Sequence, residues 1–251
     1  MEIDQIFDIL VTNKRSLTRN ALQNAILQKN DIIPYLIKNI EYLCKNHNKI
    51  DDDDANNHIC FYSLLLLSQF HCHESHETIC QLMKIPYNKK NDYLGMILGD
   101  LITEGLEQIL ANTYNGDINH IKSIVECDKA YIFVRGAALQ SLTILAIRDT
   151  IPRNIVIEYF KSLLEKRSSE RDILLWNGII INECYNLCAI ELLPLIEQKF
   201  KKNMVDKIFI QFEKNMETDQ CWIDRNINCS DNIIEILESW PYIFDKNNKK
   251  A

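Results

Sequence analysis

Potential metal ligands crowd into one ten-residue stretch of the sequence. Three imidazoles, two thiols and a carboxylate occur there, and all are groups that Zn²⁺ or a softer metal accepts; they are His71, Cys72, His73, Glu74, His76 and Cys80. His76 and Cys80 are four positions apart, so on a helix they would share a face. However, the stretch lies between two predicted helices and has no second ligand pair at a motif spacing. We expect a polar turn without a cofactor, with a zinc site as the alternative.

A second group of acidic residues has helical spacing. Asp100, Glu104 and Glu107 lie at i, i+4 and i+7, which predicts one shared helical face. Paired carboxylates can act as acid and base or can hold a hard cation. Acids at this spacing more often form a solvated face or pair with a nearby arginine. We therefore expect structural pairing, with Arg135 as the partner, rather than catalysis.

Other chemistry has weaker support in the sequence. Cys184 and Cys188 are also four apart, but the apolar residues beside them favour burial over a redox or metal role. Trp176 and Trp222 could anchor a partner, although such side chains more often fill gaps between helices. Phosphate-binding glycine loops, nucleophile elbows and His-Glu-x-x-His motifs are absent from the sequence. No catalytic residue is assigned, and an enzyme is not expected.

The elements that must position these groups are helices. The 251-residue chain has only six glycines and five prolines, fewer than the tight turns of a large sheet fold would use. Apolar residues recur at helical spacing almost throughout, and residues 59–70 are apolar nearly all round, as in a central, covered helix. The clearest stripes after it begin at Val134, Ile155 and Ile173.

Short helices in pairs predict an all-α superhelix of stacked antiparallel pairs, because one pair cannot bury its own apolar face. The best unit runs from Asp117, a helix N-cap, to Ile147. Its second helix carries Asp128 and then residues 134–139 (Val-Arg-Gly-Ala-Ala-Leu), which resembles the second helix of HEAT-type repeats. We predict one domain over 1–244, an exposed acidic loop at 45–57 containing Asp51 to Asp54, and a disordered tail at 245–251.

The net charge and the cysteine content indicate the cellular compartment of the protein and the classes of molecule it can bind. A net charge of −7 with no clustered basic stripe opposes binding to nucleic acid or an anionic membrane. The nine cysteines fall mostly in apolar runs, and Met1 is followed by acidic residues rather than a basic signal-peptide start. No window is long and apolar enough to span a membrane. We expect a cytoplasmic protein with free thiols.

Five segments together resemble a bacterial family of unassigned function, domain of unknown function 1186, over about Ile6 to Ile210. They are residues 17–22, 31–36, 64–70, 99–111 and 134–139. The resemblance implies a HEAT-like array and supplies no activity. Some members carry a cysteine-rich zinc tail, which is not matched here because Cys221 and Cys229 lack Cys-x-Cys or Cys-His partners.

The function expected from the sequence is that of a protein-interaction scaffold or adaptor. Helical arrays present a continuous surface that binds another chain, and an acidic one would suit a basic or amphipathic segment. The alternative is a metal-binding protein or enzyme that uses the stretch from His71 to Cys80 or the Asp100, Glu104 and Glu107 face.

Overall fold

The computed structural model describes residues 1–12, 18–49, 54–166, 172–206 and 232–239, and within these ranges the chain forms helices and no strand. The predicted all-α fold is confirmed. The α-helices are α1 Ile3–Thr12, α2 Arg19–Leu27, α3 Lys29–Asn46, α4 Ala55–Gln69, α5 His76–Leu82, α6 Tyr93–Leu98, α7 Leu101–Glu104, α8 Leu106–Thr113, α9 Ile118–Val125, α10 Ile132–Ile147, α11 Arg153–Glu165, α12 Ile173–Asn186, α13 Leu193–Lys201 and α15 Ile233–Ser239. Short 3-10 turns, η1 His73–Ser75 and η2 Ile190–Leu192, precede α5 and α13.

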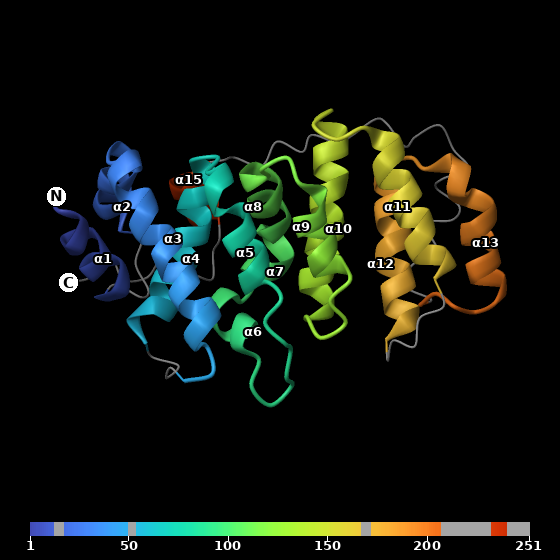
Figure 1. The fold of residues 1–251 in the computed structure, drawn as a ribbon, viewed down its shortest axis with the longest axis horizontal. Helices are drawn as coiled ribbons and strands as arrows, with labels where there is room; N and C mark the ends of the chain where they lie inside the picture. The colour runs from blue at the N-terminus through green and yellow to red at the C-terminus, as the bar shows by residue number, and fades with distance from the viewer. Residues whose placement is uncertain (13–17, 50–53, 167–171, 207–231, 240–251) are drawn as a thin grey trace.

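Most of these helices stack side by side along the long axis of the molecule (Figure 1). One layer is formed by α4, α8, α10 and α12, each in contact with the next. In the other layer α3 packs on α5, and α5 on α9. The layers meet through the pairs α3 with α4, α5 with α8, α9 with α10 and α11 with α12. Burial of one face of each helix against the other layer is what the helical periodicity of the sequence predicts.

Helix α4 lies in the middle of the N-terminal half, as its apolar sequence predicted. Leu64, Leu66 and Leu67 are completely buried, because α4 contacts α1, α3, α6 and α8 on different sides. Burying each leucine side chain contributes about 2 kcal/mol. The buried apolar residues form one cluster that extends from Ile6 in α1 to Leu237 in α15. Such a continuous core is what a single domain over 1–244 requires, and that domain boundary stays a prediction.

Several helices end with the same backbone motif, although their residues differ. The residue after the cap of α4, α10 and α12 has a positive φ: 48° at His71, 55° at Asp149 and 48° at Cys188. In each case the next backbone N–H donates to a carbonyl five residues earlier, at 3.0 Å from Cys72 to Leu67, 2.9 Å from Thr150 to Leu145 and 2.9 Å from Ala189 to Cys184. This pattern is the Schellman motif, which usually uses glycine at the left-handed position.

The capping motif also has a regular spacing. Cys188 follows Asp149 by 39 positions, and Asp149 follows His71 by twice that number. The helices α4, α10 and α12 belong to the same layer, but α13 ends in the same way: Asn203, after its cap, has a φ of 53°, and the N–H of Met204 donates to the carbonyl of Lys199 at 3.0 Å. The ends of α4, α10 and α12 are thus regularly spaced along the chain, whereas the end of α13 does not follow that spacing.

The structure corrects the predicted acidic loop at 45–57. Helix α3 continues to Asn46 and α4 begins at Ala55, where the Asp54 side chain accepts a hydrogen bond from the N–H of Asn56 at 2.8 Å. The connection is therefore shorter than the polar composition indicated, since polar residues also occupy exposed positions of helix ends. Asp51 to Asp53, Trp222 and the tail 245–251 lie outside the described residues.

The C-terminal helix α15 returns to the N-terminal half of the array (Figure 1). It packs on α2 and α4 through its buried residues Ile233, Ile234 and Leu237. The N–H of Ile233 donates to Oε1 of Gln69 at 2.9 Å, and Arg19 forms an ion pair with Glu238.

Candidate functional site

The stretch from His71 to Cys80 joins α4 to α5 and does not converge on one point. His71 and His73 are exposed, whereas His76 and Cys80 are buried on α5. The Nδ1 of His76 lies 3.2 Å from Oγ1 of Thr113, and its Nε2 lies 3.6 Å from Sγ of Cys80. The predicted shared face of His76 and Cys80 is thus present. Both ring nitrogens of His76 have partners within the protein.

Electrostatics make this pair a neutral, structural contact. Burial, followed by the charges of His120 and His73, lowers the pKa of His76 to about 4. Burial raises the pKa of the Cys80 thiol to about 12. A metal ligand needs a thiolate, and burial opposes its formation here. Across the described residues, no group of three or more His, Cys, Asp or Glu side chains is arranged to hold a metal ion.

The acidic face predicted from Asp100, Glu104 and Glu107 is divided in two, so the prediction of a single helical face is wrong. Gly105, with φ −170° and ψ −14°, separates α7 from α8. Asp100 and Glu104 are exposed at α7, whereas Glu107 lies in the first turn of α8 and is only 7% exposed. Periodicity could not reveal this break, because a lone glycine is often tolerated inside a helix.

Glu107 is a buried acid in an unfavourable environment. Burial raises the pKa of its carboxyl to about 7, and the charges of Glu183 and Glu104 add to this rise. Its Oε2 atom is buried and has no hydrogen-bond partner. Glu183 comes from α12 and is only 2% exposed. The fold therefore places acids from α7, α8 and α12 near one another, and sequence spacing did not indicate the contribution of α12.

Arg135, the predicted partner of the acids, lies on the buried side of α10. Its Nε donates to the carbonyl of Val125 at 2.8 Å, and its guanidinium lies 4.0 Å from the centroid of the Trp176 ring. Both Arg135 and Trp176 are buried. These contacts tie α10 to α9 and α12, so both residues contribute to packing between these helices.

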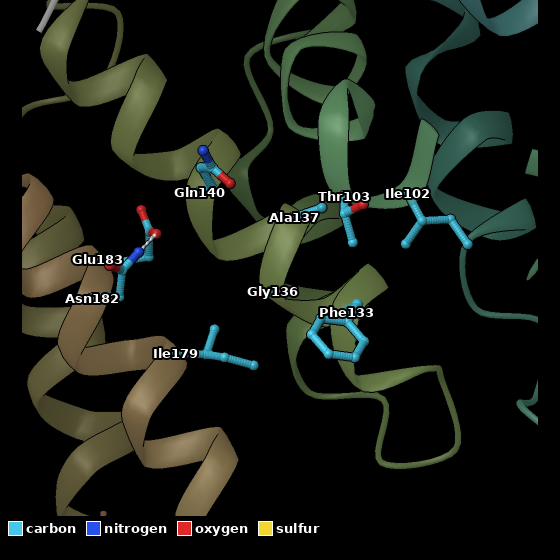
Figure 2. A pocket seen from close by; sticks show the side chains of 9 residues that line it. All are labelled: Ile102, Thr103, Phe133, Gly136, Ala137, Gln140, Ile179, Asn182 and Glu183. Atoms are coloured by element: carbon cyan, nitrogen blue, oxygen red, sulfur yellow. Dashed lines mark hydrogen bonds between the residues drawn. The ribbon is translucent and has the colours of Figure 1, made fainter. Parts of the chain in front are cut away.

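A cleft of about 230 Å³ opens between α7, α10 and α12 (Figure 2). Nine residues line it: Ile102, Thr103, Phe133, Gly136, Ala137, Gln140, Ile179, Asn182 and Glu183. At Gly136, α10 lies close to α12, since a Cβ atom there would lie 3.3 Å from Cγ2 of Ile179. The small pair at 136 and 137 belongs to the segment whose sequence resembles the second helix of HEAT-type repeats. In the structure it also provides the floor of the cleft.

The two ends of the cleft differ in polarity. Figure 2 shows Phe133 and Ile179 toward one end, and Gln140, Asn182 and Glu183 toward the other. Oε1 of Glu183 accepts hydrogen bonds from Nδ2 of Asn182 at 2.9 Å and of Asn186 at 3.1 Å. Sequence analysis did not identify this cleft, because its lining residues come from helices far apart in the chain.

An exposed aromatic cluster adjoins the apolar end of the cleft. The rings of Tyr87 and Tyr131 stack with centroids 4.5 Å apart, and the Phe133 ring packs edge-on against Tyr131 at 5.3 Å. Phe133 is 39% exposed and Tyr87 is 41% exposed. Aromatic side chains that are held rigidly at a surface are typical anchors of protein interfaces.

None of the helices in the described ranges combines the length and hydropathy that crossing a membrane requires.

A family model with the description "Protein of unknown function (DUF1186)" matches residues 1–244. An uncharacterized protein of Chlamydia muridarum (strain MoPn / Nigg) is 31% identical over 250 residues, covering 96% of this chain and 97% of that protein. An uncharacterized protein of Chlamydia trachomatis serovar D is 31% identical over 214 residues, covering 85% and 82% respectively. No solved structure matches. The expected family is thus confirmed, and the chain belongs to the bacterial DUF1186 family.

Proposed function

We propose that this chain is a protein-interaction module of the HEAT-like type and that it docks a segment of another protein in the cleft between α7, α10 and α12. The observation that carries the proposal is the cleft itself, which joins a fixed aromatic cluster to a groove floored by Gly136 and Ala137. The two-layer stack and its recurring caps support the repeat type.

A protein segment suits this surface better than a nucleic acid or a lipid headgroup. Glu104 and Glu183 lie at or beside the cleft, and the whole chain has a net charge of −7. Phosphate groups would be repelled by this field. A cleft of about 230 Å³ accommodates one or two side chains, so the rest of the segment would lie along the neighbouring aromatic surface.

The test is site-specific cross-linking followed by reconstitution. A photoreactive phenylalanine at Phe133 is compared in cells with the same group at Tyr35, which is 50% exposed on α3 at the other end of the array. The cross-linked segment is identified, synthesised and titrated against the purified chain by fluorescence anisotropy. We expect cross-links from Phe133 but not Tyr35, and binding that weakens at least about tenfold in Phe133→Ala.

A second variant separates binding from folding. Gly136→Ala adds a methyl group to the cleft floor 3.3 Å from Ile179, and it also gains helix propensity of about 1 kcal/mol. Because Ile179 is only half-buried and can shift, we expect a folded protein with weaker binding of the segment. Equal binding by the wild type, Phe133→Ala and Gly136→Ala would contradict the proposed docking site.

A further inference from the structure

We propose that the surface of α2 and α4 beneath α15 is a docking site for an amphipathic helix of a partner protein, and that α15 occupies this site as a built-in competitor. We call this surface the α2–α4 face; it includes Arg19, the first residue of α2, and Gln69, the last residue of α4. It lies in the N-terminal half of the stack, whereas α13 lies at the far end (Figure 1). The inference therefore does not depend on docking in the cleft.

Helix α15 is a small element whose order depends on being docked. It has only seven residues, and its buried side chains are Ile233, Ile234 and Leu237. Its other positions are exposed or half-buried. A helix of two turns is not stable by itself in water, so α15 is helical because it packs on α2 and α4. An element of this kind can detach as one unit without global unfolding.

The α2–α4 face is held in place by contacts that do not involve α15. Helix α2 packs on α1 and α3, and α4 packs on α1, α3, α6 and α8. These contacts remain when α15 detaches, so the face is already formed when it becomes uncovered. An uncovered apolar surface between two fixed helices is a typical binding site for the apolar side of a third helix.

Polar side chains at the two ends of the face fix the direction of the bound helix. Oε1 of Gln69 accepts a hydrogen bond from the N–H of Ile233, the first residue of α15, at 2.9 Å. Near the other end Glu238 pairs with Arg19, whose side chain is 55% exposed. The face therefore selects a helix with apolar residues at i, i+1 and i+4 and an acid at i+5, which is a pattern that another protein can supply.

A partner helix is favoured over the α15 of a second copy. An identical α15 would only replace contacts that each copy already makes within itself. The α15 of the same chain competes at a high effective concentration, so an identical helix from another molecule is at an entropic disadvantage. A longer partner helix is more helical before it binds, so it loses less conformational entropy on docking and can displace α15.

The experiment measures binding of a fluorescent helical peptide to the full chain by anisotropy. The peptide has residues 232–239, with a lactam between Glu235 and Ser239→Lys, because both positions are exposed in α15. The chain is tested as wild type and as the released variant, Ile233→Asp with Leu237→Asp, in which α15 cannot dock. We expect the released variant to bind the peptide at least about tenfold more tightly than the wild type does.

Displacement and orientation have separate readouts. With unlabelled peptide, the methyl NMR signals of Leu237 in the wild-type chain should shift as α15 leaves the face. In the released variant, the further change Arg19→Glu should weaken binding of the peptide by about two- to fivefold and should strengthen binding of the Glu238→Lys peptide. This reversal requires the peptide to lie on the face as α15 does.

Two variants control for folding. Ser239→Asp adds an acid on the exposed side of α15 and should bind the peptide as weakly as the wild type does. Circular dichroism shows whether the released variant keeps its helix content; if it does not fold, Leu237→Ala weakens the same contact more mildly and should also increase peptide binding.

Three results would overturn the inference. The first is a folded released variant, or Leu237→Ala variant, that binds the peptide no more tightly than the wild type. The second is the absence of a preference reversal with Arg19→Glu. The third is a wild-type dimer in sedimentation that the released variant lacks, since this would assign the α2–α4 face to the α15 of a second copy.

Discussion

Replacing Glu107 by glutamine should remove a pH-dependent loss of stability. The pKa of this carboxyl is raised from 4.5 to about 7 in the folded protein, first by burial and then by Glu183 of α12 and Glu104 of α7. Arg148, which follows α10, donates from Nη2 to the neighbouring Gln108 at 2.9 Å. Between pH 4.5 and 7 the folded state thus holds a proton that the unfolded state has lost, so stability falls as pH rises. The full effect, present above pH 7, is about 3 kcal/mol.

Glu107→Gln keeps the size of the side chain and stays neutral at every pH. Urea unfolding, followed by circular dichroism at 222 nm at pH 5, 6, 7 and 8 with reductant present, gives the free energy of unfolding for both proteins. We expect the free energy of unfolding of the variant, relative to that of the wild type, to increase as pH rises, by up to about 3 kcal/mol between pH 5 and 8. The amide N–H₂ adds a donor whose burial could cost about 1–3 kcal/mol at every pH, so the slope rather than the offset is diagnostic.

The control is Glu104→Gln on α7, where the side chain is exposed. Because the charge of Glu104 raises the pKa of Glu107 less than burial and Glu183 do, this variant should lose stability with rising pH almost as steeply as the wild type does. If the curves of Glu107→Gln and the wild type were parallel, the carboxyl of Glu107 would not be desolvated in the way its burial implies.

Three further results are expected. The pKa of His76 is lowered to about 4, so the free energy of unfolding of the wild type should fall by about 3 kcal/mol as pH falls from 6.5 to 4. His76→Asn should lose less stability, which urea unfolding at pH 4.5 and 7 measures. Equal losses for the two proteins would contradict this prediction. Arg148→Ala should lower the free energy of unfolding at pH 7 by about 2–4 kcal/mol, because Nη1 of Arg148 donates to Asn112 at 2.7 Å and Nη2 donates to Gln108, and both acceptor residues are buried. A decrease below about 0.5 kcal/mol would show that these hydrogen bonds do not hold α8 to α10. Chelation with EDTA should leave the melting temperature unchanged, because the described residues assemble no cluster of three donors, and stoichiometric metal lost on chelation would refute this.

Helix type and the buried faces followed from the sequence, because the 3.6-residue period reports burial directly. Asp117 was correctly predicted as an N-cap, and its carboxylate accepts from the N–H of Asn119 at 2.9 Å. The break at Gly105 was not predicted, because a lone glycine is often tolerated inside a helix and its sequence position alone does not mark a helix end.

The candidate site was less predictable than the fold. Glu107 was noticed because of its spacing with Asp100 and Glu104, but the larger effect on its pKa comes from Glu183 of α12, two helices further along the same layer. Hydrophobic periodicity identifies which face of a helix is buried. A cleft instead depends on which exposed positions of different helices face each other. That pairing is set by helix lengths and crossing angles, and a single sequence does not specify them.

The capping motif explains why two sequence clusters resembled chemical sites. His71 and Cys188, the first residue of the histidine-rich stretch and the second member of the cysteine pair, occupy equivalent left-handed positions after α4 and α12. Asp149 holds the same position after α10. The residue that follows each of them donates its N–H to a carbonyl in the last turn of the helix, so the position is defined by the backbone and not by a ligand. His71, Asp149 and Cys188 share this position with Asn203 after α13, so four different side chains are placed by the same kind of helix end. We therefore expect the functional surface of this chain at the cleft, where side chains of α7, α10 and α12 meet, rather than at the helix ends.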